Sequence, residues 1–396
     1  MKLYKNTTQA VIDSLTQIFD DRKYADKVIE KILKSNSKWG ARDRRFIAET
    51  TYDIVRWYRL LMEVTEAEPN DYWKLLGGWC AMNEAELPDW VEFEGINRKT
   101  VLRRWEEVKG IRKIAESVPD WMDELGEREL GRIWNEELQA LNEEARVVLR
   151  ANTLKTTMKQ LYRELSEAEV DVELDDRYPD ALIMKQRQNV FLLPQFKQGL
   201  FEVQDAGSQA IAPFLEVEPG MRVIDACAGA GGKTLHLAAL MQNKGRIVAM
   251  DTEEWKLTEL KLRARRAGAG NVETRVIESS KTIKRLDKAA DRILLDVPCS
   301  GLGVIRRNPD AKWKLSVEFI EKVKELQQHI LQDYCTMLKP GGKLVYSTCS
   351  LMPSENEKQV EKFLAANPNF TLEAEKHIWP SEGFDGFYMA RLKRTS

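Results

Sequence analysis

The feature that most constrains this chain is a series of apolar, strand-like runs in its second half. The runs are MRVIDAC, GRIVAMD, DRILLDVPC and GGKLVYSTCS, and longer stretches with helical periodicity separate them. Strands that alternate with helices predict an α/β fold with a doubly wound parallel sheet covered on both faces. Ligands of such sheets bind beside the carboxyl ends of the strands. The residues after each run are therefore the first candidates for a functional site.

The rest of the chain shows two other sequence patterns. The first 140 residues have helical periodicity and hold most of the Trp residues, as expected for large core side chains of a helical bundle. From about Arg146, the runs RVVLRANTL, VDVELDD, ALIMK and NVFLL predict short strands around one amphipathic helix. We therefore expect a helical domain over residues 1–140, a small α/β module over 141–205 and a Rossmann-like domain over 206–396.

Charge and cysteine content exclude several classes of protein. The 396 residues include 61 Lys and Arg against 63 Asp and Glu, a net charge of -2, so a polyanionic partner must contact local basic patches. The 5 cysteines form no CxxC pair, which argues against a zinc site and against a disulfide framework. No secretory signal and no long apolar run occur. We expect a cytoplasmic protein that uses neither a metal nor a membrane.

A glycine-rich turn follows the first strand-like run, Val223–Asp225. It reads ACAGAGGKT, and helical periodicity resumes immediately after it. Glycines let a backbone approach a ligand at a helix N-terminus, but this spacing matches neither the phosphate loop GxxxxGK[ST] nor the dinucleotide motif GxGxxG. The pattern favours a nucleotide-like ligand with little phosphate. Asp251, at the end of the next run, is placed to bind ribose hydroxyls or, alternatively, to cap the following helix.

Two cysteines also follow strand-like runs. Cys299 lies in DVPCSGLG and Cys349 lies in YSTCS, each in a polar turn where a buried filler is not needed. Because the carboxyl ends of parallel strands meet at one edge, we expect both thiols and Asp296 to face the same cleft as the glycine turn. We interpret Cys80 and Cys335 as small core residues.

These blocks resemble the RsmB/Nop2/Sun (NSUN) family of S-adenosylmethionine-dependent RNA cytosine-5 methyltransferases. The resemblance covers DACAGAGGKT, DRILLDVPCSGLGVIRRNPDAKW and STCSLMPSENE, with support from RANTLK, VQDAGSQ and DGFYMARLKR. Upstream, ARDRRFIAETTYDIVRWYR and SVPDWM resemble the NusB-like helical extension of bacterial RsmB-type members. The resemblance implies a Rossmann-like methyltransferase domain preceded by an all-α NusB-like bundle and a small α/β RNA-binding module.

The resemblance also implies roles for individual residues. Cys349 is the expected nucleophile toward cytosine carbon-6, Cys299 assists product release, Asp296 contacts the base, and Lys233 supplies positive charge. S-adenosylmethionine is expected to contact Cys227, Ala228, Gly229, Ala230, Gly231, Gly232, Lys233, Asp251, Asp296 and, at the adenine, Glu278 or Ser279. The loop Arg306–Asp310 with Lys312 and Trp313, and the segment Lys256–Arg266, are expected to face RNA.

Small-subunit (16S) rRNA is the expected substrate, bound by a monomeric enzyme. The same chemistry on tRNA or another RNA is an alternative, because these motifs specify the reaction and not the RNA substrate. A non-catalytic NusB-like RNA-binding factor is a second alternative, against which the presence of Cys299, Cys349 and Asp296 argues. A nicotinamide oxidoreductase is disfavoured by the absence of GxGxxG.

Overall fold

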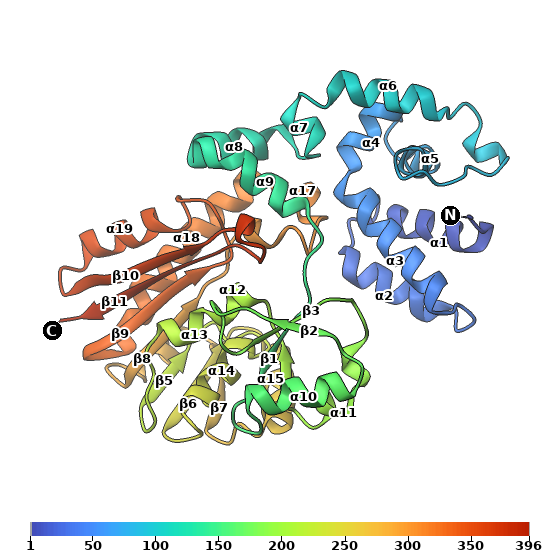
Figure 1. Cartoon of the computed structure of the whole chain (residues 1–396). Coiled ribbons are helices and arrows are strands. Elements are labelled where there is room, and N and C mark those ends of the chain that lie inside the picture. Colours follow the sequence, from blue (N-terminus) through green and yellow to red (C-terminus); the bar gives the residue numbers. More distant parts are fainter. Residues whose placement is uncertain (1, 396) are drawn as a thin grey trace. The chain divides into compact units, whose positions relative to one another are not determined.

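The computed structural model describes residues 2–395, and the chain divides into two compact units (Figure 1). One unit comprises the chain up to Glu143 together with Ile305–Val317, and the other comprises Glu144–Val304 and the chain from Glu318. The helical unit thus contains a segment that the sequence analysis assigned to the Rossmann-like domain. No helix within residues 2–395 combines the length and apolarity needed to cross a bilayer.

The N-terminal part of the helical unit forms only helices and turns among the described residues, as the periodicity predicts. Its core consists of apolar side chains from successive helices, including Val11, Leu15, Ile54 and Leu61, each at most 1% exposed. The elements are α1 (Lys5–Phe19), α2 (Ala25–Ser35), α3 (Ala41–Arg56), α4 (Tyr58–Thr65), α5 (Tyr72–Met82), η1 (Val91–Phe93), α6 (Arg98–Val108), α7 (Arg112–Ala115), α8 (Asp120–Leu130), η2 (Gly131–Ile133) and α9 (Trp134–Asn142).

The segment Ile305–Val317, with the short helix α17 (Ala311–Lys314), completes this unit. Lys312 is fully buried, and its Nζ donates hydrogen bonds to Arg56 O (3.2 Å), Glu116 O (3.2 Å), Ser117 O (3.1 Å) and Asn142 Oδ1 (2.6 Å). Arg306 donates to the carbonyl of Ala140, and Asp310 accepts from the backbone N–H of Ala25. The expectation that this loop faces RNA is wrong for Lys312, Arg306 and Asp310, because their side chains hydrogen-bond backbone atoms inside the helical unit instead.

The small module is an antiparallel sheet of order β2-β3-β1-β4 with one amphipathic helix. Its elements are β1 (Val148–Ala151), α10 (Met158–Glu167), β2 (Val172–Leu174), β3 (Ala181–Met184), η3 (Val190–Leu192), α11 (Pro194–Lys197) and β4 (Phe201–Val203). The predicted strand NVFLL is wrong. The Asn189 side chain caps a 3-10 turn there, and Pro194, which fixes its own φ, starts the next helix.

The unit that comprises Glu144–Val304 and the chain from Glu318 also contains, within the described chain, a seven-stranded sheet of order β10-β11-β9-β8-β5-β6-β7. Its strands are β5 (Arg222–Asp225), β6 (Arg246–Asp251), β7 (Val272–Val276), β8 (Ala290–Asp296), β9 (Leu338–Thr348), β10 (Phe370–Ile378) and β11 (Phe387–Arg394). Strands β5 to β9 are parallel, as predicted, but β11 is antiparallel to both of its neighbours. The short connection between Ile378 and Phe387 permits only an antiparallel hairpin at this edge.

Helices cover both faces of this sheet (Figure 1). One layer contains α12 (Ala206–Gln209), α13 (Ile211–Phe214), α14 (Gly232–Leu240) and α15 (Glu254–Ala267). The other contains α16 (Ser280–Lys284), α18 (Val317–Tyr334) and α19 (Glu357–Ala366), with short 3-10 turns η4 (Leu302–Val304), η5 (Cys335–Met337) and η6 (Pro380–Glu382) elsewhere in the unit. Side chains on β5, β6 and β8 are consequently buried on both faces, which leaves the strand ends as the accessible part of the sheet.

Replacement of Lys312 by methionine tests the role of this buried amine. The variant Lys312→Met keeps the length of the side chain but leaves Asn142 Oδ1 and the carbonyls near it without their donor. We expect a loss of about 3 kcal/mol in unfolding free energy, since orphaned buried acceptors cost about 1–3 kcal/mol each and neighbours relax in part. Urea unfolding followed by Trp fluorescence reports on this Trp-rich unit. The exposed Lys31→Met is the control, and equal stability of the two variants would contradict the assignment.

Candidate active site

The parallel strands bring the candidate residues to one edge of the seven-stranded sheet. Asp225 pairs with Ala249 of β6 and Leu294 of β8, and Asp296 pairs with Ser347 of β9. Along this edge lie, in the order of strands β7, β6, β5, β8 and β9, the residues Glu278, Asp251, the turn 226–231, Asp296 with Cys299, and Cys349. The structure therefore brings together residues spread over more than a hundred positions of sequence.

The glycine turn between β5 and α14 requires glycine at two positions. Gly229 and Gly231 have φ of 53° and 89°, in the region that side chains other than glycine rarely adopt. A Cβ at Gly231 would also lie 2.5 Å from Leu260 Cγ, whereas nothing lies within 4 Å of a Cβ at Gly229. The turn packs closely against α15 at Gly231 and presents open backbone at Gly229. Such a backbone at a helix N-terminus suits a nucleoside ligand.

Asp251 performs a structural task beside its expected ligand role. Its Oδ2 accepts a hydrogen bond from the Gly229 N–H at 3.0 Å, and its Oδ1 accepts from the Glu253 N–H at 2.9 Å. The carboxylate thus links the glycine turn to the start of α15, which is the capping role that the sequence left open. Each carboxylate oxygen retains a second lone pair, so the group can still accept hydrogen bonds from ribose hydroxyls.

Two arginines hold the carbonyls of the glycine turn, and sequence reasoning assigned this role to neither. Arg150 of β1 is 2% exposed and donates to Gly232 O at 2.8 Å and to Gln204 Oε1 at 2.7 Å. Arg263 of α15 donates to Ala230 O at 2.9 Å and pairs with Glu202 at 2.8 Å. The expected RNA-facing role is therefore wrong for Arg263. The only hint in the sequence is a charged residue inside the apolar run VVLRA.

The adenine-side candidates lie next to Asp251. Val276 of β7 pairs with Asp251 of β6, and Glu278 and Ser279 follow it at the same edge. Both side chains are exposed, and Ser279 is the N-cap residue of α16. The backbone thus brings both candidates beside the proposed ribose position, as expected from the strand order.

The two strand-end thiols are in direct contact. Cys299 Sγ and Cys349 Sγ lie 3.3 Å apart, after the neighbouring strands β8 and β9. The hydrogen bond with Cys349, together with burial and the nearby Glu355 carboxylate, raises the pKa of Cys299 well above its ordinary value. The Gly303 N–H also donates to the carbonyl of Cys349 at 2.8 Å, which ties the two cysteine loops through their backbones. The raised pKa of Cys299 favours its protonated form.

An ion pair lies beside the thiols. Lys233 Nζ donates to Asp296 Oδ2 at 2.6 Å, and the Ser347 hydroxyl donates to Asp296 Oδ1 at 3.0 Å. Burial alone lowers the pKa of Lys233, but the Asp296 carboxylate and the nearby Cys349 outweigh it and raise that pKa. Lys233 is thus a cation near Cys349, and a neighbouring cation stabilises a thiolate. The charges around the pair are unequal, with an ammonium near Cys349 and a carboxylate near Cys299.

Cys80 and Cys335 do not share this setting. Cys80 and Cys335 are buried, and burial raises their pKa to about 12 and about 11. These values fit the prediction of inert core residues. Among residues 2–395, no group of three or more His, Cys, Asp or Glu side chains is arranged to hold a metal ion.

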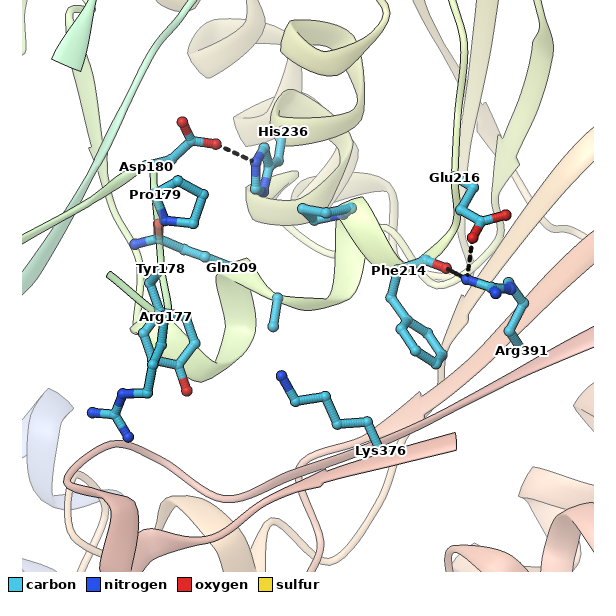
Figure 2. Close-up of a pocket in the computed structure, with 12 residues that line it drawn as sticks. Arg177, Tyr178, Pro179, Asp180, Gln209, Phe214, Glu216, His236, Lys376 and Arg391 are labelled. Atoms are coloured by element: carbon cyan, nitrogen blue, oxygen red, sulfur yellow. Dashed lines mark hydrogen bonds and ion pairs between the residues drawn. The ribbon is translucent and has the colours of Figure 1, made fainter. Parts of the chain in front are cut away.

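A separate cavity of about 320 Å³ lies in the unit that contains the seven-stranded sheet (Figure 2). Its lining includes Tyr178, Phe214, Lys376 and His236 of α14, and neither Cys299 nor Cys349 is part of it in the described chain. His236 is 2% exposed and its Nε2 lies 3.2 Å from Asp180 Oδ2. Burial and the Arg150 charge lower the pKa of His236 to about 4. This cavity is distinct from the strand-end edge.

The fold and the strand-end edge define an S-adenosylmethionine-dependent methyltransferase domain with a Rossmann-like sheet. Comparison with known proteins is more specific. The family model of the 16S rRNA methyltransferase RsmB/F matches residues 212–393, and the model of the ferredoxin-like domain of RsmF/B-like methyltransferases matches residues 118–191. The chain belongs to the RsmB/F family of methyltransferases, as predicted.

Individual relatives cover most of the chain. A protein of Synechocystis sp. (strain PCC 6803) named "Probable ribosomal RNA small subunit methyltransferase B" is 30% identical over 94% of this chain and 96% of its own length. Ribosomal RNA small subunit methyltransferase B of Enterobacter sp. (strain 638) is 34% identical over 69% of this chain and 66% of its length. The crystal structure of PH0851 covers 100% of both chains with a TM-score of 0.83 and 26% identity.

The buried His236 predicts how stability depends on pH. Its folded pKa of about 4 lies below the ordinary 6.5, so the unfolded chain binds more protons between these values. The stability that this group contributes is present above pH 6.5 and is lost as the pH falls toward 4. Between pH 7 and pH 5, we expect the unfolding free energy of His236→Gln to fall by about 2 kcal/mol less than that of the wild type, as 1.36 kcal/mol per pKa unit implies. Urea unfolding at both pH values measures this difference. The control is the exposed His329→Gln, and an unchanged pH slope in His236→Gln would contradict the prediction.

Proposed function

We propose that this protein transfers a methyl group from S-adenosylmethionine to carbon-5 of a cytosine in small-subunit rRNA. The observation that carries the proposal is the contact of Cys299 and Cys349 beside the Lys233–Asp296 ion pair. A single methyl transfer to an oxygen or amine does not need two thiols. The names of the relatives support the small-subunit rRNA as the substrate.

The chemistry explains why two sulfurs are needed. Carbon-5 of cytosine is a weak nucleophile, so a thiolate first adds to carbon-6 and converts the ring into an enamine. S-adenosylmethionine, when bound, would supply the electrophilic methyl group for carbon-5, with S-adenosylhomocysteine as the leaving group. A base then removes the carbon-5 proton, and the carbon–sulfur bond breaks to restore the aromatic ring and release the thiolate. One sulfur therefore forms the bond, and the second group assists its release.

The unequal charges support one assignment of the two roles. Cys349, near the Lys233 cation, is the nucleophile because a cation favours the thiolate. Cys299, whose pKa is raised, remains a thiol that exchanges protons during release. Asp296 projects from the end of β8 and contacts the ring nitrogen or amino edge of the base, where a preorganised carboxylate stabilises the activated ring. Lys233 orients that carboxylate through the hydrogen bond between them.

The residues present fit S-adenosylmethionine. The turn Cys227–Gly232, with its open backbone at Gly229, holds the methionine end of the cofactor. Asp251 accepts hydrogen bonds from the ribose hydroxyls. Glu278 or Ser279 contacts the adenine. The proposal further includes a cytoplasmic enzyme that binds RNA as a monomer.

Substitution of the two cysteines tests the reaction. With labelled S-adenosylmethionine and RNA that lacks the modification, the wild type is expected to form 5-methylcytosine in small-subunit rRNA. Cys349→Ala is expected to lose at least about 10³-fold in rate, because the nucleophile is absent. Cys299→Ala is expected to accumulate a covalent RNA adduct on denaturing gels. Cys335→Ala is the control. Methylation of tRNA alone would contradict small-subunit rRNA as the substrate, and an active Cys349→Ala would contradict Cys349 as the nucleophile.

Replacement of Asp251 tests the cofactor site. Asp251→Ala removes the ribose acceptor and the tie to Gly229, so we expect at least about a tenfold rise in the Kd for S-adenosylmethionine, equivalent to about 1.4 kcal/mol. Isothermal titration calorimetry measures the Kd. The exposed Asp287→Ala is the control, and an unchanged Kd in Asp251→Ala would exclude the ribose role.

A further inference from the structure

A buried carboxylate joins the two cysteine loops. Glu355 is 0% exposed and follows Cys349 in the loop between β9 and α19. Its Oε1 accepts hydrogen bonds from the hydroxyls of Ser300 and Ser350, both at 2.5 Å. Its Oε2 accepts from the Ser300 N–H at 2.8 Å and from Gln327 Nε2 at 3.1 Å. Both oxygens are therefore fully engaged inside the protein.

The two serines are the immediate neighbours of the two thiols. Ser300 follows Cys299 and Ser350 follows Cys349, so the same carboxylate contacts the residue after each cysteine. Gln327 of α18 also donates to the carbonyl of Pro298, on the other side of Cys299. The Glu355 carboxylate thus connects the Cys299 loop, the Cys349 loop and helix α18.

The donors around the Glu355 side chain match a group that accepts hydrogen bonds at both oxygens. Its donors are neutral: two hydroxyls, one backbone N–H and one side-chain amide. A buried carboxylate costs free energy unless hydrogen bonds compensate it, and these four supply that compensation. Glutamine has the same shape, but its NH2 group would face either the backbone N–H and the Gln327 amide or the two hydroxyls, which would then have to accept instead of donate. Glutamate therefore accepts all four hydrogen bonds, whereas glutamine does not.

We propose that Glu355 is a positioning residue that sets the contact between the Cys299 and Cys349 thiols by bridging their loops. The proposal rests on the two-cysteine mechanism given above. It adds a residue that touches neither substrate nor cofactor. Its negative charge also acts on Cys299, since the Glu355 carboxylate contributes to the raised pKa of that thiol. Glu355 thereby maintains both the contact between the sulfurs and the raised pKa of Cys299.

The contact between the thiols can be measured without any methyl transfer. Phenylarsine oxide forms two arsenic–sulfur bonds with a pair of adjacent thiols and releases water, so its capture reports on the Cys299–Cys349 contact. In the full-length protein, we expect Glu355→Gln to slow capture at least tenfold by intact mass. We also expect kcat for methyl transfer to fall at least tenfold while the Kd for S-adenosylmethionine stays unchanged. Cys299→Ser gives the background, and Glu361→Gln on α19 is the matched control.

A second readout separates positioning from a general loss of structure. In a Cys349→Ser background, Glu355→Gln is expected to lower the pH midpoint of Cys299 alkylation by iodoacetamide, because the carboxylate is gone. Capture at the wild-type rate in Glu355→Gln, or an unchanged midpoint, would overturn the proposal. If Glu355→Gln does not fold, Ser300→Ala and Ser350→Ala replace it, and wild-type capture in both would also overturn it. If the wild type captures arsenic and Glu355→Gln slows that capture, but the wild type forms no 5-methylcytosine, only the proposed function would be refuted.

Discussion

The register of the parallel strands is the constraint on which the site depends. β5 lies between β6 and β8, and β9 continues the sheet beyond β8, so four strand ends open side by side. Asp296 faces Ser347 across one pair, and this register brings the loops that carry Cys299 and Cys349 side by side. A shift of one residue in β9 would turn Ser347 and its neighbours to the other face of the sheet. The apolar side chains that bury β8 and β9 on both faces therefore also fix the reactive geometry.

Buried charges define the loops that the strands alone leave free. Arg150 and Arg263 hold the carbonyls of Gly232 and Ala230, Asp251 holds the Gly229 N–H, and Glu355 holds both cysteine loops. Each of these groups is charged and satisfies polar backbone or side-chain atoms at the edge of the core. A charged hydrogen bond is directional and roughly twice as strong as a neutral one, so such groups specify one loop conformation where apolar packing would accept several.

The sequence predicted the features that depend on local pattern. Apolar runs between helices predicted β5, β6, β8 and β9, and the strand-end rule then predicted that Asp251, Asp296 and both thiols would share an edge. Features that depend on partners far along the chain were not predictable in the same way. The direction of β11 follows from the length of its connection to β10, and the role of Arg263 follows from a carbonyl that only the folded turn presents. The charged stretch RRNPDAKW looks solvated in sequence because periodicity does not show which unit buries it.

That same stretch has a consequence for the reactive loop. The chain leaves the catalytic unit after Val304 and returns at Glu318, so the loop that carries Cys299 leads directly into a segment that Lys312 anchors in the helical unit. Gly303 stands at this exit. Its N–H donates to Cys349 O and its carbonyl accepts from the Gly386 N–H, both at 2.8 Å, while a Cβ there would lie 2.3 Å from Gly386 O. Only glycine lets the backbone be held so closely from both sides. The position of Cys299 is thereby fixed within the catalytic unit before the chain enters the other one.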